Sequence, residues 1–214
     1  MSDKSFAEAF KRVFEPIPGQ AMPGQPLTGQ DAPTKCLVAR QFDTPLGAMI
    51  ALAGDEGIYL LEFADRRDLE DEMLQLRKQL QCSLLPGNNA HLERLAEELK
   101  HYFDGTSLEF SVPLVKFGTP FEVSVWNLLL TIPPGETRSY IQIAQALGQP
   151  GATRAVGHAN GNNHIAILIP CHRVIHSDGS MSGYAGGTWR KEWLLDHERK
   201  LQSPPGSQLP LFGE

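Results

Sequence analysis

The stretch Ile169-Pro170-Cys171-His172-Arg173-Val174 places a cysteine directly before a histidine and an arginine, and the apolar run 165–169 leads into it. A thiol needs help to ionise at neutral pH, and cationic or basic neighbours provide that help. The stretch therefore predicts an activated cysteine nucleophile. What this nucleophile attacks must be inferred from the rest of the chain.

The other two cysteines, Cys36 and Cys82, lie far from Cys171 and form no Cys-x-x-Cys pair. Three distant cysteines indicate neither a disulfide framework nor a thiolate zinc site. Cys36 belongs to an apolar, strand-like run, where a free cysteine behaves as a small hydrophobe. We therefore expect both of these thiols to be inert.

Composition and charge describe an ordinary globular protein of 214 residues with a net charge of −6. No apolar run approaches the roughly 20 residues of a membrane span, and residues 1–10 lack the apolar core of a secretory signal. We therefore expect a cytoplasmic protein without membrane contact. From Arg138 to Ser177 the chain has no acidic residue but three arginines and four histidines. This single cationic zone contains Cys171, so binding to nucleic acid is not excluded by the net charge.

Residues 5–19 begin as an amphipathic helix with Phe6, Phe10, Val13 and Phe14 on one face. This stretch resembles the last helices of AraC-type DNA-binding domains, although an unrelated amphipathic helix would read the same way. Only that fragment is present, so no working helix-turn-helix can be built from it. Residues 17–35 are rich in Pro, Gly and Gln and predict a linker.

Two folded domains are expected after this first segment of 1–35, with a boundary near residues 116–119. The first domain, 36–117, predicts strands at 36–41, 48–53, 57–63 and 111–115 and helices at 68–81 and 91–103. The second, 118–200, is mostly helical, with expected helices at 121–132, 140–147 and 153–160. Thr137 or Ser139 can cap the middle helix.

The last two of these helices are short and joined by a Gly-containing turn, which is the sequence shape of a helix-turn-helix. Arg154 lies at the start of the second, where a recognition helix meets DNA. Many unrelated helix pairs share this pattern. The fold class that we predict is α+β or α/β in two domains.

Several motifs occur in order and together carry a family resemblance: Gly135-Glu136-Thr137-x-Ser139-Tyr140, Arg154-Ala155-Val156-Gly157, Asn163, Ile167–Val174, Ser182-Gly183-Tyr184-x-Gly186-Gly187 and Lys191-Glu192-x-Leu194-Leu195-x-x-Glu198. They resemble the O6-alkylguanine-DNA alkyltransferases. The match is highly specific over residues 117–199 and looser over 36–115. The resemblance implies an RNase H-like first domain and a helix-turn-helix in the second. With the AraC-like fragment, the chain resembles a cut-down regulator of the Ada type.

The resemblance also implies a reaction, in which Cys171 takes the alkyl group from O6-alkylguanine in double-stranded DNA, once per molecule. Glu198 would orient His172, which would draw the thiol proton through a water molecule. Tyr140 would protonate the departing guanine, and Asn163 would hold the site together. No cofactor and no metal are implied, since the zinc ligands of some family members are missing from this N-terminus.

The target base must leave the duplex, and the resemblance assigns DNA-binding residues for this step. Arg154 would fill the vacated stack, and the neighbouring small residues Ala152, Thr153 and Ala155 would let their helix approach closely; Arg173 is grouped with them. The expected pocket wall contains Val174, Tyr184, Ala185, Gly186 and Asn160. Ala185 stands where the family often has serine, and Asn160 where other members have a hydrophobic residue.

The tail, 201–214, is rich in Pro, Ser and Gly and is expected to be flexible. Within it, Gln208, Leu209, Leu211 and Phe212 resemble the pentapeptide that binds the bacterial sliding clamp. The expected partners are therefore damaged duplex DNA and the sliding clamp, and we expect a monomer.

Three other functions fit parts of the sequence. An alkyltransferase-like protein that flags lesions without transfer would lack the cysteine, whereas this chain has Cys171. A transcription regulator would need the rest of the AraC-type module. A cysteine hydrolase would need an oxyanion hole and repeated turnover, and no motif in the sequence indicates either.

Overall fold

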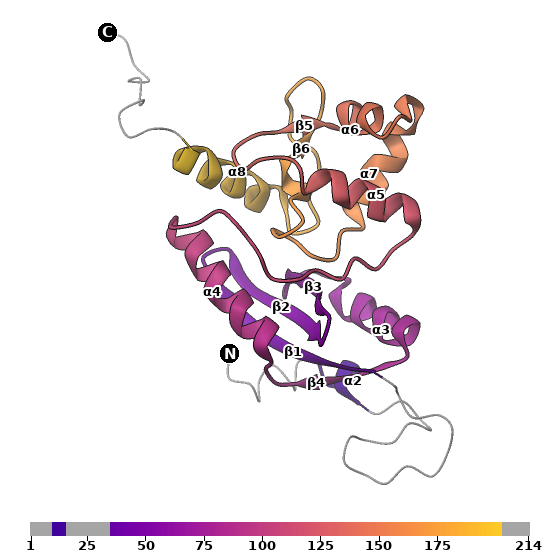
Figure 1. Cartoon of the computed structure of the whole chain (residues 1–214), viewed down its shortest axis with the longest axis vertical. Coiled ribbons are helices and arrows are strands. Elements are labelled where there is room, and N and C mark those ends of the chain that lie inside the picture. Colours follow the sequence, from indigo (N-terminus) through magenta and orange to yellow (C-terminus); the bar gives the residue numbers. More distant parts are fainter. Residues whose placement is uncertain (1–9, 16–34, 203–214) are drawn as a thin grey trace. The chain divides into compact units, whose positions relative to one another are not determined.

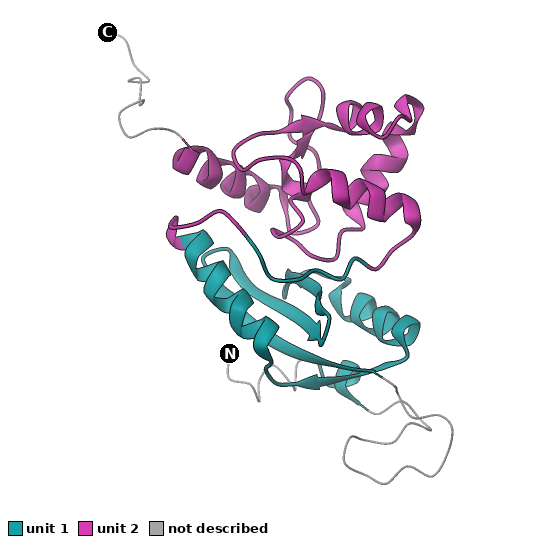
Figure 2. Cartoon of the chain, viewed as in Figure 1, with its two compact units in different colours: residues 1–103, 110–116 teal, residues 104–109, 117–214 magenta. Residues whose placement is uncertain are grey.

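The computed structural model describes residues 10–15 and 35–202 of the chain, which form two compact units (Figures 1 and 2). The first unit comprises residues 1–103 and 110–116, and the second comprises residues 104–109 and 117–214. The chain thus passes into the second unit after Phe103, returns for one short segment, and leaves the first unit after Lys116. No sequence pattern indicated this brief exchange. Helices and strands are both present, as expected for an α+β protein.

A four-stranded sheet forms the centre of the first unit. Its strands are β1 (Lys35–Thr44), β2 (Gly47–Gly54), β3 (Gly57–Phe63) and β4 (Cys82–Pro86), in the spatial order β3-β2-β1-β4. The first three strands pair antiparallel through two-residue turns, and β4 pairs parallel with β1. Every residue of β3 is buried, which explains why its sequence is apolar apart from Glu62, and Glu62 pairs with Arg66 at 3.0 Å.

Two amphipathic helices complete this unit, α3 (Leu69–Leu80) and α4 (Ala90–Asp104), and Figure 1 shows α4 running along the sheet. Helix α3 buries Leu69, Met73 and Leu76, which join one hydrophobic core with side chains of the sheet. Its first turn is acidic and its last turn is basic, and these charges stabilise the helix by interacting favourably with its dipole. Both helices lie close to the positions that their apolar periodicity predicted.

The prediction of a strand at 111–115 is wrong. This segment meets the sheet at a single parallel bridge, between Ile58 and Leu114. Ile58 donates to the carbonyl oxygen of Pro113, and Val115 donates back to Ile58. Pro113 has no N–H group, so it cannot extend a ladder. Gly57 permits the close approach, since a Cβ atom there would lie 2.3 Å from the Pro113 carbonyl oxygen.

The segment that resembles an AraC-type helix is described from Phe10 onward, and its earlier residues lie outside the described part, as do 16–34. Helix α2 (Lys11–Phe14) packs against the first unit. Val13 is fully buried in the hydrophobic core, and Phe10 and Phe14 pack against that core. The buried Arg77 donates to the Val13 carbonyl oxygen at 2.9 Å. The described residues of the fragment, 10–15, therefore contribute to the core of the first unit.

The second unit contains helices α5 (Pro120–Leu129), α6 (Tyr140–Ala146), α7 (Thr153–Gly161) and α8 (Thr188–Gln202). Capping boxes fix the first two: Thr119 with Glu122 begins α5, and Ser139 with Gln142 begins α6. Trp126 of α5 is buried and donates from its indole to the Ala159 carbonyl oxygen of α7 at 2.8 Å. These contacts fix α7 within the unit.

A parallel pair of two-residue strands joins distant segments of the second unit. Strand β5 (Arg138–Ser139) pairs with β6 (Val174–Ile175), and Arg138 lies opposite Val174. Tyr140 follows β5 directly, and the short 3-10 helix η2 (Cys171–Arg173) precedes β6 directly. The ladder therefore holds Tyr140 and Cys171 in one neighbourhood. Among the described residues, no helix is long and apolar enough to cross a membrane.

The burial of Val13 gives a test of the role of α2. We expect Val13→Ala to lower the free energy of unfolding of the first unit by about 2 kcal/mol, because it removes two buried methyl groups. Urea denaturation measures this change. Arg12→Ala is the control, since the Arg12 side chain is 67% exposed and its pair with Glu70 spans 3.4 Å. Losing that pair costs less than about 0.5 kcal/mol. Equal losses from both variants would contradict the role that we assign to Val13.

Candidate active site

The backbone that leads to Cys171 is a buried, strained turn. Ile167 has φ = 70°, in the left-handed region that a β-branched residue rarely adopts. Around it, the Leu168 N–H donates to the Ala166 carbonyl oxygen at 2.8 Å, which closes a three-residue turn. A conformation of this kind costs about 1–3 kcal/mol and persists only where its surroundings hold it.

Asn163 holds this turn from both sides. Its Oδ1 accepts from the Ile165 N–H at 3.1 Å, and its Nδ2 donates to the Ile169 carbonyl oxygen at 2.9 Å. The same Nδ2 lies 3.1 Å from Sγ of Cys171. One buried amide thus fixes the backbone on either side of Ile167 and gives the sulfur a hydrogen-bond donor. A donor at this position stabilises a thiolate over a thiol.

His172 follows the thiol and is fully buried beside the equally buried Glu198 of α8. His172 Nε2 lies 2.9 Å from Oε1 of Glu198. Burial lowers the pKa of His172 despite this carboxylate, so the imidazole is neutral near pH 7. Because Nε2–H donates to Glu198 in the neutral form, Nδ1 is left as an acceptor. Nδ1 has no hydrogen-bond partner among the described residues.

Arg173 is buried and therefore not available to contact DNA, so the prediction that it is a DNA-binding residue is wrong. Its guanidinium is buried and donates to both oxygens of Glu198, at 2.9 and 2.8 Å, and to the Ile132 carbonyl oxygen at 2.6 Å. Burial alone would raise the pKa of Glu198, but His172 and Arg173 together hold that pKa well below its usual range. Arg173 therefore keeps Glu198 ionised.

Glu198 also accepts from the backbone N–H of Gly135 at 3.1 Å. Gly135 has φ = 75°, a conformation that favours glycine, in the turn after Pro133 and Pro134. The carboxylate therefore has donors from two segments of the unit, this turn and the η2 helix, and Arg173 also donates to the Ile132 carbonyl oxygen. Sequence reasoning assigned Glu198 a single partner and did not identify these other contacts.

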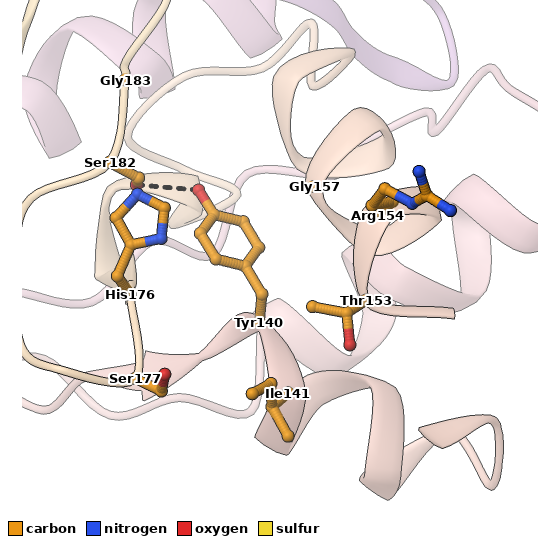
Figure 3. Close-up of a pocket in the computed structure, with 9 residues that line it drawn as sticks. All are labelled: Tyr140, Ile141, Thr153, Arg154, Gly157, His176, Ser177, Ser182 and Gly183. Atoms are coloured by element: carbon orange, nitrogen blue, oxygen red, sulfur yellow. Dashed lines mark hydrogen bonds between the residues drawn. The ribbon is translucent and has the colours of Figure 1, made fainter. Parts of the chain in front are cut away.

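Beside this buried cluster a pocket of about 410 Å³ opens, lined by Tyr140, Ile141, Thr153, Arg154, Gly157, His176, Ser177, Ser182 and Gly183 (Figure 3). None of these residues is acidic, two carry basic side chains, and four carry hydroxyl groups. Tyr140 donates to Ser182 Oγ at 2.8 Å. Burial raises the pKa of the Tyr140 phenol, which favours its protonated form, and the charge of Cys171 raises it further.

Arg154 is exposed near the start of α7 and, within the described residues, makes no hydrogen bond or ion pair. Thr153 lines the pocket with it, whereas Ala155 is exposed and Ala152 is half-buried just before the helix. The arginine is thus available to a ligand that approaches this face, and its small neighbours leave room around it. Figure 3 shows Arg154 and Thr153 projecting from the first turn of this helix.

None of the five residues expected in the pocket wall lines this pocket. Val174 is fully buried, Gly186 is buried, Tyr184 is half-buried and Ala185 is exposed. Asn160 is buried behind the nucleophile, where its Nδ2 donates to the Cys171 carbonyl oxygen at 3.3 Å. Cys171 itself is 6% exposed.

Comparisons with known proteins point to one family. Residues 120–200 match the family model for the 6-O-methylguanine DNA methyltransferase DNA-binding domain. A methylated-DNA–protein-cysteine methyltransferase of Shigella flexneri is 41% identical over 171 residues, which cover 77% of this chain and 97% of that protein. One from Mycobacterium leprae is 42% identical over 160 residues, which cover 75% and 91%.

A solved structure, that of Mycobacterium tuberculosis OGT in complex with DNA, matches with a TM-score of 0.66 at 40% identity, over 77% of this chain and 94% of that one. The chain belongs to the methylated-DNA–protein-cysteine methyltransferases.

Three residues that sequence reasoning did not assign belong to the same part of this methyltransferase. Ser182 bonds to Tyr140 and also donates to the Val174 carbonyl oxygen at 3.2 Å. Lys191 of α8 is fully buried and donates to that same carbonyl oxygen and to Ser182. Arg190 is buried and donates to the Gly186 carbonyl oxygen at 2.7 Å, which fixes the loop before α8. A buried lysine has no sequence signature, because helix periodicity does not separate it from a surface lysine.

In residues 10–15 and 35–202 of the methyltransferase, no group of three or more His, Cys, Asp or Glu side chains is placed to hold a metal ion.

The buried carboxylate gives a stability prediction. We expect Glu198→Gln to lower the free energy of unfolding at pH 7 by about 3 kcal/mol, because it leaves the Arg173 charge buried without a counter-charge. Chemical denaturation measures the change. Glu136→Gln is the matched control, since Glu136 pairs with Arg138 at 2.9 Å but is half exposed. That variant should lose less than about 0.5 kcal/mol.

The same measurement has a pH dependence of known sign. The folded pKa of Glu198 is depressed, so its contribution is present above the unfolded value near 4.5 and is lost as the pH falls toward the folded value. The difference between wild type and Glu198→Gln should therefore shrink below about pH 5. A difference that stays constant down to pH 3 would contradict this assignment.

Proposed function

We propose that the protein repairs O6-alkylguanine in duplex DNA by transferring the alkyl group to Cys171, once per molecule. The observation that carries this proposal is the buried Glu198–His172 pair next to a cysteine that has its own amide donor. The names of the relatives, methylated-DNA–protein-cysteine methyltransferases, support the same reaction. The reaction class is alkyl transfer from oxygen to sulfur, and it needs no cofactor.

The thiolate is generated by His172 and held by Asn163. Nδ1 of the neutral His172 accepts the thiol proton through a water molecule, and Glu198 stabilises the imidazolium that forms. The Asn163 amide, 3.1 Å from the sulfur, then stabilises the anion.

The chemical step is an in-line displacement. The thiolate attacks the alkyl carbon, an S–C bond forms, and the C–O bond breaks with its electron pair moving onto guanine. Tyr140 gives its proton to a ring nitrogen of the departing base, which avoids a free guanine anion. The product is a thioether without an easy leaving group. A thioether does not exchange with thiols, so neither Cys36 nor Cys82 would restore the free Cys171 thiol.

The base reaches this site by leaving the duplex. We propose that α6 and α7 act as a helix-turn-helix, that Arg154 fills the vacated stack, and that Thr153, Ala155 and Ala152 allow close approach. The acid-free pocket beside Tyr140 then receives the flipped nucleotide, and its hydroxyl and basic groups suit a sugar and a phosphate. Val174, Tyr184, Ala185, Gly186 and Asn160 would surround the alkyl group beyond it.

We also propose a fold for the first unit and an oligomeric state for the protein. The first unit is proposed to be RNase H-like, supported by its antiparallel hairpins and parallel β1–β4 edge. A monomer suffices for the reaction, because one chain supplies all of the groups named above.

The intact mass of the protein shows whether Cys171 takes up one methyl group. After incubation with duplex DNA that contains O6-methylguanine, wild type should gain one methyl group and no more. Cys171→Ala should gain none, whereas Cys36→Ala should gain one, and it is the matched control because Cys36 is exposed. Either an unchanged mass for wild type or several turnovers per molecule would refute the proposal.

The C-terminal tail gives a second proposal, that Gln208, Leu209, Leu211 and Phe212 bind the bacterial sliding clamp. These residues lie outside the described part, and the support is their sequence alone. Deleting 208–212 should abolish capture of the purified protein on immobilised clamp while leaving methyl transfer unchanged. Capture that survives the deletion, or that wild type never shows, would rule the proposal out.

A further inference from the structure

A histidine that the proposed mechanism does not use stands on the exposed face of α7. His158 is exposed and lies one turn after Arg154, so the two side chains project from the same side of the helix. Thr153 and Gly157, each one residue earlier, line the pocket. Figure 3 shows Arg154 on the side of α7 that faces away from Tyr140. His158 therefore continues, one turn further along, the face on which Arg154 lies.

Asn162 holds the ring of His158. Its Nδ2 lies 3.0 Å from His158 Nδ1, and the same Nδ2 donates to Oε1 of Glu122 on α5 at 2.7 Å. Although partial burial acts to raise it, the pKa of Glu122 is lowered by hydrogen bonds from Asn162 and Thr119, so this carboxylate is ionised and can only accept. The Asn162 amide is therefore fixed in orientation, and both hydrogens of its Nδ2 point to acceptors.

These contacts determine which ring nitrogen of His158 carries the proton. Nδ1 faces an N–H of Asn162 and must accept, so the proton of the neutral imidazole is on Nε2. A ring with protons on both nitrogens would lose the bond from Asn162. Among the described residues, Nε2 has no hydrogen-bond partner. His158 thus presents one oriented N–H donor next to Arg154.

We propose that the His158 Nε2–H donates to a phosphate oxygen of the duplex while Arg154 fills the vacated base stack. This inference rests on the proposed function. One turn of α7 spans about 6 Å, and a DNA groove is about 6 to 12 Å wide, so a side chain one turn beyond Arg154 lies near the groove edge, where the phosphates are. A phosphate oxygen accepts hydrogen bonds and does not donate them, so it is complementary to this N–H.

The contact holds α7 in place without reading the sequence. Phosphate contacts fix the register and orientation of a protein on DNA and carry no base information. A neutral donor also neutralises no phosphate charge, so it displaces no counterion from the duplex, unlike a lysine or an arginine. His158 is thus a DNA-binding residue, whereas Asn162 and Glu122 act through it and are positioning residues.

A purely structural role is the alternative, because the backbone N–H of Asn162 also ends α7 on the His158 carbonyl oxygen. The two roles predict different results. If His158 only stabilises the end of α7, its loss lowers the melting temperature. If it donates to DNA, its loss weakens binding and leaves the melting temperature close to that of wild type, since exposed side chains contribute little to stability.

The experiment measures the Kd of the full-length protein for an undamaged, fluorescein-labelled duplex by anisotropy, at about pH 8, where an imidazole is neutral. We expect His158→Leu to raise the Kd about tenfold, the order for one hydrogen bond to a charged acceptor. His158→Gln should restore most of the affinity, because the glutamine amide has an N–H at a similar reach. His101→Leu is the matched control, since His101 is exposed on α4 of the first unit, and it should leave the Kd unchanged.

Three further readouts separate the possible roles. In single-turnover methyl transfer from an O6-methylguanine duplex, His158→Leu should raise the half-saturating DNA concentration and not lower the maximal rate. The slope of log Kd against log salt should be the same for wild type and His158→Leu, because a neutral donor displaces no counterion. Asn162→Ala should raise the Kd in the wild-type background and have no further effect in a His158→Leu background.

Equal Kd values for wild type and His158→Leu would overturn the proposal, as would a melting temperature that falls together with the affinity. A salt slope that falls by about one would mark a charged contact and would also overturn it, as would a His158→Gln protein that binds no better than His158→Leu. Wild-type protein that binds the duplex but takes no methyl group would instead overturn the proposed function itself.

Discussion

The second unit depends on one buried carboxylate. Glu198 is fully buried, and its two oxygens accept from His172, from Arg173 and from the backbone of Gly135. A carboxylate that is removed from water is tolerated only where its lone pairs have donors. Satisfying this one charge therefore draws together helix α8, the η2 helix and the turn after α5. The same requirement fixes the neutral tautomer of His172, so the chemistry of the thiol follows from the electrostatics of the core.

The strained turn next to Cys171 is likewise held by a single buried side chain, that of Asn163. Asn163 uses one amide to hold Ile165 and Ile169 and to face the sulfur. A side chain with both a donor and an acceptor is needed, because the turn presents both a free N–H and free carbonyl groups. The site is thus rigid without a regular strand or helix on its entry side, and the reactive atom lies at the end of a fixed backbone.

Much of this architecture was predictable from the sequence, and the failures have physical reasons. Apolar periodicity predicted α3 and α4 and the turn residues predicted β1–β3. Strand β4 was missed because five residues after a helix carry no period, and its place is decided by pairing with β1. The motifs predicted that Glu198 meets His172, and the two side chains lie 2.9 Å apart. Arg173 was misassigned, because whether an arginine meets DNA or a carboxylate depends on contacts across 25 residues of chain.

The site around Cys171 can form only after β5 and β6 have paired during folding. His172 and Glu198 are 26 residues apart, and Tyr140 is joined to Cys171 only through pairing of distant strands. Contacts that close long loops form late in folding, since the entropy of closure must be overcome first. Until then Cys171 is an ordinary thiol, mostly protonated at neutral pH. The base and the amide donor beside Cys171 therefore act on the thiol only in the folded molecule.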